Sequence, residues 1–221
     1  MSDGFEQMVD EARAFFARLE ANNSKEWFDP HKAHYKEAIA GPAAFFADLV
    51  AGDLARLTGT PHRPKVFRIY RDVRFSKDKT PLNTHLHMMW HPANNDVLAP
   101  SWFWGLSQGY FVMGMGVMGL QGESLTRYRA FIDHHGDGVQ EALDGAADAV
   151  CATLSDWGPD PLKNVPKPYD ADHPHAALLK RKALAISAPI PDDWRDTGVL
   201  KASVQVAKGL LPLWEIFDKN L

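Results

Sequence analysis

Seven cationic side chains are concentrated between residues 63 and 79, where only Asp72 and Asp78 oppose them. These charges give the segment a net +5, and because the whole chain stands at −4, the remaining residues carry −9. Guanidinium groups bind carboxylates and phosphates through paired hydrogen bonds, and a strand holds such groups rigidly. The cluster therefore predicts a site for a small anion that bears a phosphate or a carboxylate.

The predicted ligand-binding set combines the cations of this segment with two polar neighbours. It consists of Arg68, Arg71, Asp72, Arg74, Ser76, Lys77 and Lys79. Nearby cations favour the charged form of a carboxyl group, so Asp72 is expected to be ionised and to orient the arginines. Two alternatives stay open: the cations form ion pairs within the protein, or they meet an acidic partner protein without catalysis. The short patch and the negative overall charge argue against nucleic acid.

An enzyme that acts on a phosphorylated or acidic substrate is a further alternative. His173 is its candidate acid or base, because an imidazole titrates near neutrality, and Asp72 is a weaker candidate. This hypothesis requires His173 to lie within reach of the cationic segment. A structural role is the other interpretation, since Asp172 and Pro174 are residue types that begin helices. The sequence leaves open whether the chain is an enzyme.

His85 and His87 lie two residues apart, so a strand would present both on one face, with His91 further along it. Imidazole nitrogens can converge on a metal ion, and His173 or His175 could supply a third ligand. However, the spacing places no carboxylate beside them. We therefore favour hydrogen-bonding or surface histidines, and expect no metal and no cofactor.

Hydrophobic periodicity indicates the elements that must position these groups. Helical spacing predicts a first helix over 5–19 and a second that opens at Asn23 with a capping box to Glu26. Gly41-Pro42 should end the second helix and begin a third, and Pro212 should kink or break the last one. The remaining helices are expected over 123–134, 137–154, 175–184 and 199–217.

A period of two predicts strands in the middle of the chain. The first covers 65–75, with an apolar face of Phe67, Ile69, Val73 and Phe75. Others are expected over 82–90, 102–106 and 110–118. Helices, then antiparallel strands, then helices give an α+β arrangement in a single domain over residues 1–221.

Residues 97–122 contain no charged side chain, and that length could span a bilayer. Their six glycines and a turn at 106–109 instead favour two strands, so we expect no membrane segment. The acidic start lacks the pattern of a secretory signal, and a single cysteine, Cys151, excludes a disulfide framework. We expect Cys151 to be buried in a helix and the protein to be cytoplasmic. The oligomeric state is left open.

Three segments resemble one family of proteins. The most specific is Arg68-Ile69-Tyr70-Arg71-Asp72-Val73-Arg74-Phe75-Ser76-Lys77-Asp78-Lys79-Thr80-Pro81. The others are Asn22-Asn23-Ser24-Lys25-Glu26-Trp27-Phe28 and Pro166-Lys167-Pro168-Tyr169-Asp170-Ala171-Asp172-His173-Pro174. Together they resemble the Domain of Unknown Function 2461 family, which implies a single α+β domain and carries no established activity. The chain departs from the family pattern at Leu82-Asn83, where an aromatic residue and a lysine are usual, and at Pro168, where glycine is usual.

Overall fold

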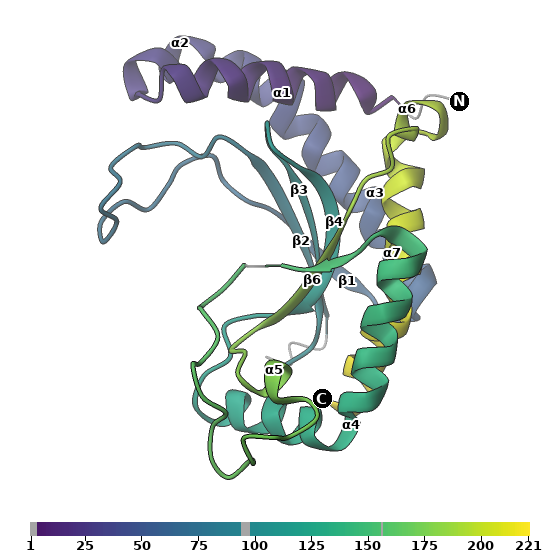
Figure 1. Cartoon of the computed structure of the whole chain (residues 1–221). Coiled ribbons are helices and arrows are strands. Elements are labelled where there is room, and N and C mark those ends of the chain that lie inside the picture. The colour runs from purple at the N-terminus through teal and green to yellow at the C-terminus, as the bar shows by residue number, and fades with distance from the viewer. Residues whose placement is uncertain (1–3, 94–97, 156) are drawn as a thin grey trace.

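Helices open and close the chain, and its strands form one sheet (Figure 1). The computed structural model describes residues 4–93, 98–155 and 157–221. The helices are α1 (Glu6–Ala21), α2 (Lys25–His34), the π-helix η1 (Tyr35–Ala40), α3 (Gly41–Thr58), α4 (Gly122–Val150), α5 (Ala176–Leu179), α6 (Trp194–Thr197) and α7 (Val199–Asn220). The strands are β1 (His62–Val66), β2 (Leu86–Pro92), β3 (Ser101–Leu106), β4 (Phe111–Val117), β5 (Thr153–Leu154) and β6 (Leu184–Pro189). The α+β prediction is confirmed.

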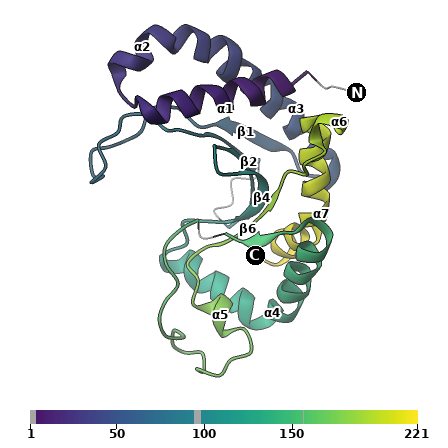
Figure 2. The ribbon, with the colours of Figure 1, turned by 45° about the horizontal axis from the view of Figure 1, so that its top comes forward.

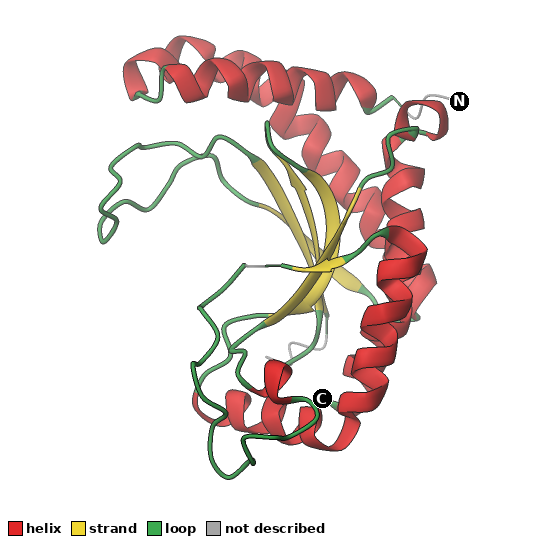
Figure 3. Ribbon diagram, viewed as in Figure 1, coloured by secondary structure: helices red, strands yellow, loops and turns green. Residues whose placement is uncertain are grey.

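The sheet is antiparallel throughout, in the order β1-β2-β3-β4-β6-β5 (Figure 3). β3 and β4 form the hairpin predicted in the uncharged segment, so that segment is not a membrane helix. β2 alternates between buried and half-buried residues as predicted, but it begins at Leu86 rather than at residue 82. The edge strand β1 contains Pro64, which a sheet tolerates at an edge because no neighbour needs its missing N–H.

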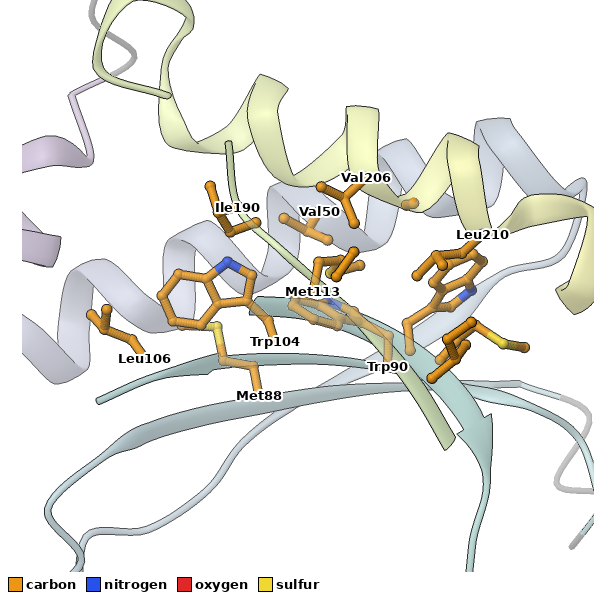
Figure 4. Close-up of a cluster of buried hydrophobic side chains, with 14 of the residues drawn as sticks. Val50, Met88, Trp90, Trp104, Leu106, Met113, Ile190, Val206 and Leu210 are labelled. Atoms are coloured by element: carbon orange, nitrogen blue, oxygen red, sulfur yellow. The ribbon is translucent and has the colours of Figure 1, made fainter. Parts of the chain in front are cut away.

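The core lies between one face of the sheet and the helices α3 and α7 (Figure 4). Trp90 and Trp104 extend from β2 and β3 toward these helices. The indole N–H of Trp90 donates to the carbonyl oxygen of Ala47 at 2.7 Å, and that of Trp104 donates to Oγ of Ser203 at 3.1 Å. These bonds satisfy buried polar groups and fix both helices against the same sheet face.

The predicted strand over 65–75 is wrong beyond Val66. The chain leaves the sheet there and forms a projecting arm, defined here as residues 67–83 (Figures 1 and 2). Its two limbs pair with each other: Asn83 N–H donates to the Ile69 oxygen at 2.7 Å, and Arg71 N–H donates to the Pro81 oxygen at 2.9 Å. Ile69 is buried, but Phe75 is 96% exposed, because no layer of the protein lies beneath the outer part of the arm.

The chain stays helical from Lys25 to Thr58, so the predicted break at Gly41-Pro42 is wrong. Gly41 N–H donates to the oxygen of Lys36, five residues back, in the wide turn of η1. This widened turn accommodates Pro42, which lacks an N–H and would crowd the preceding turn of a regular helix. The helix is long and apolar enough to cross a membrane by length and composition, a test that core helices also pass. Its α3 part packs on β1 and α7, as a helix does in a soluble globular domain.

The two helices predicted over 123–154 are one helix, α4, which runs through Gly136 and Gly138. A Cβ at Gly136 would lie 2.1 Å from Cδ2 of His175, so this glycine permits close packing and does not break the helix. α4 ends at Val150, and the C-cap residue Cys151 has a left-handed φ of 55°. Cys151 is exposed, and the expectation of burial is wrong because the residue lies at the helix terminus.

Two predictions for the last part of the chain also change. The helix expected over 175–184 is only the short α5, because residues from Leu184 onward pair with β4. α7 continues as one helix through Pro212, so of the predicted kink or break only the break is wrong. Pro212 is exposed, so the carbonyl group one turn earlier, which loses its hydrogen bond, can face water.

Candidate anion-binding site

The arm is tied to the body by the side chain of Asn23, which lies between α1 and α2. Asn23 Nδ2 donates to the carbonyl oxygen of Leu82 at 2.9 Å, and its Oδ1 accepts from the Leu82 N–H at 3.1 Å. The predicted capping box is therefore wrong: Ser24 is the N-cap of α2, and its hydroxyl accepts from the Trp27 N–H at 3.2 Å. Tyr70 adds an edge contact to Phe28, with ring centroids 5.7 Å apart.

A hollow of about 270 Å³ lies between the arm and the start of β2. Its lining joins three of the predicted anion ligands with both candidate metal histidines. The lining residues are Phe67, Arg68, Tyr70, Arg71, Asp72, Asn83, His85 and His87. Arg74, Ser76, Lys77 and Lys79 belong to the outer part of the arm and do not line it. The structure thus brings together only the inner part of the predicted set.

Arg71 is held in place within the arm. Its Nη1 donates to Oδ2 of Asp78 at 2.6 Å and to the carbonyl oxygen of Thr80 at 3.0 Å, and it also contacts the Thr80 hydroxyl. The Thr80 N–H, together with Arg71, lowers the pKa of Asp78 to about 2. Arg71 is therefore a positioned cation, because its bonds fix the guanidinium group beside the hollow.

Arg74 forms the structural ion pair that the sequence left open as an alternative. Its Nε and Nη2 donate to the two carboxylate oxygens of Asp72 at 2.9 and 2.6 Å. These bonds hold the pKa of Asp72 below its usual value, so Asp72 is ionised as predicted, but its partner is Arg74. Lys79 Nζ donates to the Val73 oxygen at 3.0 Å. Within the described part of the chain, Arg68 makes no ion pair.

The two histidines line the hollow on the side of β2. Their rings stack with centroids 3.8 Å apart, and Nε2 of His87 lies 2.6 Å from the hydroxyl oxygen of Tyr110. Burial lowers the pKa of His87 to about 4, with a further contribution from His85. Burial, followed by the charge of Arg71, also lowers the pKa of His85. Both imidazoles are therefore uncharged at neutral pH in the free protein.

The other candidate residues lie elsewhere. His173 Nε2 is 3.0 Å from Oδ1 of Asp133, and His175 Nε2 is 2.8 Å from Oδ1 of Asp137, both on α4. The arm lies beside α2, whereas α5 and α4 lie at the other end of the sheet (Figures 1 and 2). The structure therefore does not bring His173 to the arginines. Over the described residues, no three or more His, Cys, Asp or Glu side chains are grouped to hold a metal ion.

Sequence reasoning missed Asn83 and Tyr110. Asn83 Nδ2 donates to the carbonyl oxygen of Arg68 at 3.1 Å, which fixes the backbone that carries the Arg68 side chain. The alternation that places His85 and His87 on one face also places Asn83 there, so that signal was present in the sequence. Tyr110 had no comparable signal, because it reaches His87 across β3 from the turn before β4.

A family model described as "Conserved hypothetical protein (DUF2461)" matches residues 11–215, which include the arm, the hollow and the whole sheet. No curated protein matches the chain.

Proposed function

The chain belongs to the DUF2461 family of conserved hypothetical proteins, and we propose that it binds a small anionic ligand in the hollow beneath the arm. The ligand carries a phosphate or a carboxylate group. Arg68 and Arg71 bind that group, while Asp72, Arg74 and Lys79 maintain the conformation of the arm. Ser76 and Lys77, at the tip of the arm, make no direct contact with the ligand, and the charge of Lys77 contributes at most a long-range electrostatic attraction. The single cysteine suits a reducing compartment, so the proposal places this binding in the cytoplasm.

One observation carries the proposal: of the two arginines that line the hollow, Arg71 is held by hydrogen bonds within the arm, and Arg68 makes no ion pair among the described residues. Asp78 and Thr80 already hold Arg71, so its orientation costs little entropy when a ligand binds. Arg68 has no ion-pair partner among the described residues, so its five N–H donors can serve a ligand. The lining carries the positive charges of Arg68 and Arg71 against the negative charge of Asp72, which Arg74 already pairs, and both histidines are uncharged in the free protein. The net charge of the lining is therefore positive, which attracts an anion.

Calorimetric titration with inorganic phosphate and ribose 5-phosphate, at low and moderate salt, tests the proposal. The decisive comparison is Arg68→Gln against Lys77→Gln, because both remove one positive charge from the arm and Lys77 is exposed and does not line the hollow. Losing a charge-assisted hydrogen bond costs roughly 1.5–3 kcal/mol, so Arg68→Gln should weaken binding about tenfold or more. Lys77→Gln should change affinity about twofold or less. Equal losses in both variants, or no binding to the wild type, would contradict a specific site.

The exposed ring of Phe75 favours a second candidate, docking of an acidic partner protein without catalysis. Phe75 lies at the tip of the arm, and the guanidinium carbon of Arg74 is 5.9 Å from the centroid of its ring. A hexaglutamate peptide is the probe for this candidate. Binding of the peptide that Phe75→Ser weakens, together with no response to phosphate or ribose 5-phosphate, would replace the first proposal by the second.

A further inference from the structure

A band of aromatic side chains continues from the hollow across the sheet. We call it the aromatic band; it consists of His87, Phe103, Tyr110 and Trp157. The ring centroid of Trp157 lies 6.0 Å from that of His87, 6.3 Å from that of Phe103 and 6.4 Å from that of Tyr110. All four side chains are half-buried. His87 belongs both to the band and to the lining of the hollow, so the two surfaces are continuous.

The band lies on the sheet face opposite to the core. Met88 and Trp104 are cross-strand partners on the core face, so His87 and Phe103, one residue earlier in each strand, face the other way. Figures 1 and 3 show the helices α3 and α7 along one side of the sheet only. A half-buried aromatic surface on the other side is therefore available to a ligand.

Gly105 allows the rings to lie close to the backbone of the sheet. It is the cross-strand partner of His87 in β2. A Cβ at this position would lie 3.1 Å from the Tyr110 ring and 3.2 Å from the His87 ring. With glycine there, the hydroxyl of Tyr110 reaches Nε2 of His87, and this bond fixes both rings. The band is thus a positioned surface rather than a chance cluster of aromatic residues.

We propose that the ligand is an anion that carries a planar aromatic ring, with the anionic group in the hollow and the ring on the aromatic band. This inference rests on the proposed function. The hollow of about 270 Å³ is smaller than the roughly 300–1,000 Å³ of a typical small-molecule site. It therefore accommodates the anionic end, and the rest of the ligand must lie on a neighbouring surface. Aromatic side chains bind planar rings by stacking, regardless of the ring's substituents.

The ring spacing indicates where the ligand ring lies. A ring sandwiched between two others needs about 3.5 Å on each side, or about 7 Å between the outer planes. The centroids of His87 and Trp157 are only 6.0 Å apart and their planes are tilted by 39°, so a third ring does not fit between them. Phe103 supports Trp157 nearly at right angles, at 83°. The ligand ring is therefore expected to lie on the solvent side of the band, and Trp157, which contacts the other three rings, is the expected stacking partner.

Calorimetric titration with AMP, ribose 5-phosphate and adenosine tests the inference. AMP and ribose 5-phosphate share the phosphate and differ in the base, whereas adenosine lacks the phosphate. The wild type should bind AMP about tenfold more tightly than ribose 5-phosphate, because stacking of one base contributes roughly 1–3 kcal/mol. Adenosine should bind more weakly than either. Indole-3-acetate against acetate makes the same comparison for a carboxylate, and a gain from the ring in either pair supports the inference.

Trp157→Ala should remove the difference in affinity between AMP and ribose 5-phosphate and leave the affinity for ribose 5-phosphate unchanged. Trp157→Phe should retain most of that difference. Trp27→Ala is the matched control, because Trp27 stacks on His31 in α2, away from the band. If the wild type binds each ring-bearing anion no more tightly than its ring-free counterpart, the inference fails. Loss of ribose 5-phosphate binding in Arg68→Gln would then show that the proposed function still holds. If no anion binds to the wild type, the proposed function itself fails.

Discussion

The side chain of Asn23 forms two hydrogen bonds with the backbone of Leu82, one to its carbonyl oxygen and one from its N–H. The two residues are 59 positions apart in the chain. An amide side chain with one donor and one acceptor matches a peptide unit in this way, as a strand partner would. Asn23 thus replaces the neighbouring strand that the arm lacks, and it sets the position of the limb that leads to Asn83 and His85.

Asn23→Ala should destabilise the protein and weaken anion binding. It leaves both polar groups of Leu82, a buried residue, without this partner, at a cost of about 1–3 kcal/mol each where water cannot replace it. Urea unfolding measures the change in stability, and hydrogen exchange should show faster exchange at the Leu82 amide. Asn22→Ala is the matched control, because the Asn22 side chain only donates to the Arg18 oxygen at an exposed position. Equal effects of the two substitutions would refute the role of Asn23.

Two glycines of α4 should respond oppositely to alanine. In an exposed helix position alanine is favoured over glycine by roughly 0.5–1 kcal/mol, and a Cβ at Gly145 meets no atom within 4 Å. Gly145→Ala should therefore stabilise the protein. Gly136→Ala should destabilise it, because the new Cβ would lie 2.1 Å from Cδ2 and 2.5 Å from Cγ of His175. Thermal unfolding of both variants checks the opposite signs, and stabilisation by both would contradict the close packing of His175.

The stability of the protein should fall as the pH falls from about 6.5 to 4. Burial lowers the pKa of His62 from 6.5 to about 4, whereas the unfolded chain takes up the proton near 6.5. In this window the unfolded state binds more protons, so its free energy falls relative to the native state, by up to about 3 kcal/mol for this group. Urea unfolding across the window measures the slope. His62→Gln should make the slope shallower, and an unchanged slope would show that His62 does not contribute.

Anion binding should take up a proton through His85. Burial and Arg71 lower the pKa of His85 in the free protein, and a bound anion beside the ring favours its charged form. The pKa is then higher in the complex, so affinity rises as the pH falls, by up to about tenfold per pH unit. Inorganic sulfate is the suitable probe, because it does not titrate in the range where histidine does.

Calorimetry of sulfate binding in two buffers of different ionisation enthalpy counts the protons taken up. His85→Gln should abolish the uptake. His91→Gln should preserve it, because Nδ1 of His91 lies 2.7 Å from the Ser101 hydroxyl and His91 does not line the hollow. Proton uptake that survives in His85→Gln would assign the effect to another group.

Hydrophobic periodicity predicted the elements that bury one side against the core. It identified β2, the β3–β4 hairpin and α1, because their apolar residues lie against helices or the sheet. It failed at the arm, since a strand in a sheet and two limbs that pair with each other have the same period of two. Phe75 fits the predicted apolar face, yet it is exposed because nothing lies beneath it.

Glycine and proline were the other source of error. Helix breaks were predicted at Gly41-Pro42 and between residues 134 and 137. Gly41-Pro42 instead follows a widened helical turn, and Gly136, within the second place, serves close packing with His175. Both explanations depend on atoms far away in the sequence or on a backbone geometry that residue type does not specify. The same limit applies to the site. The sequence shows the cluster of charges, but it does not show that Arg74 pairs with Asp72 while Arg68 makes no ion pair among the described residues.

The arm joins the body through few contacts, with Ile69 and Leu82 buried and the residues between them largely exposed. Insertions near Phe75 would therefore leave the core intact, because doubling the length of a loop costs only about 0.6 kcal/mol. The length and the charge of the tip can be changed by insertion or substitution while the hollow and the sheet stay the same. Changes in the number and type of residues between Asp72 and Lys79 should accordingly alter the long-range field of the tip or its contact with a partner, and leave the residues that line the hollow in place.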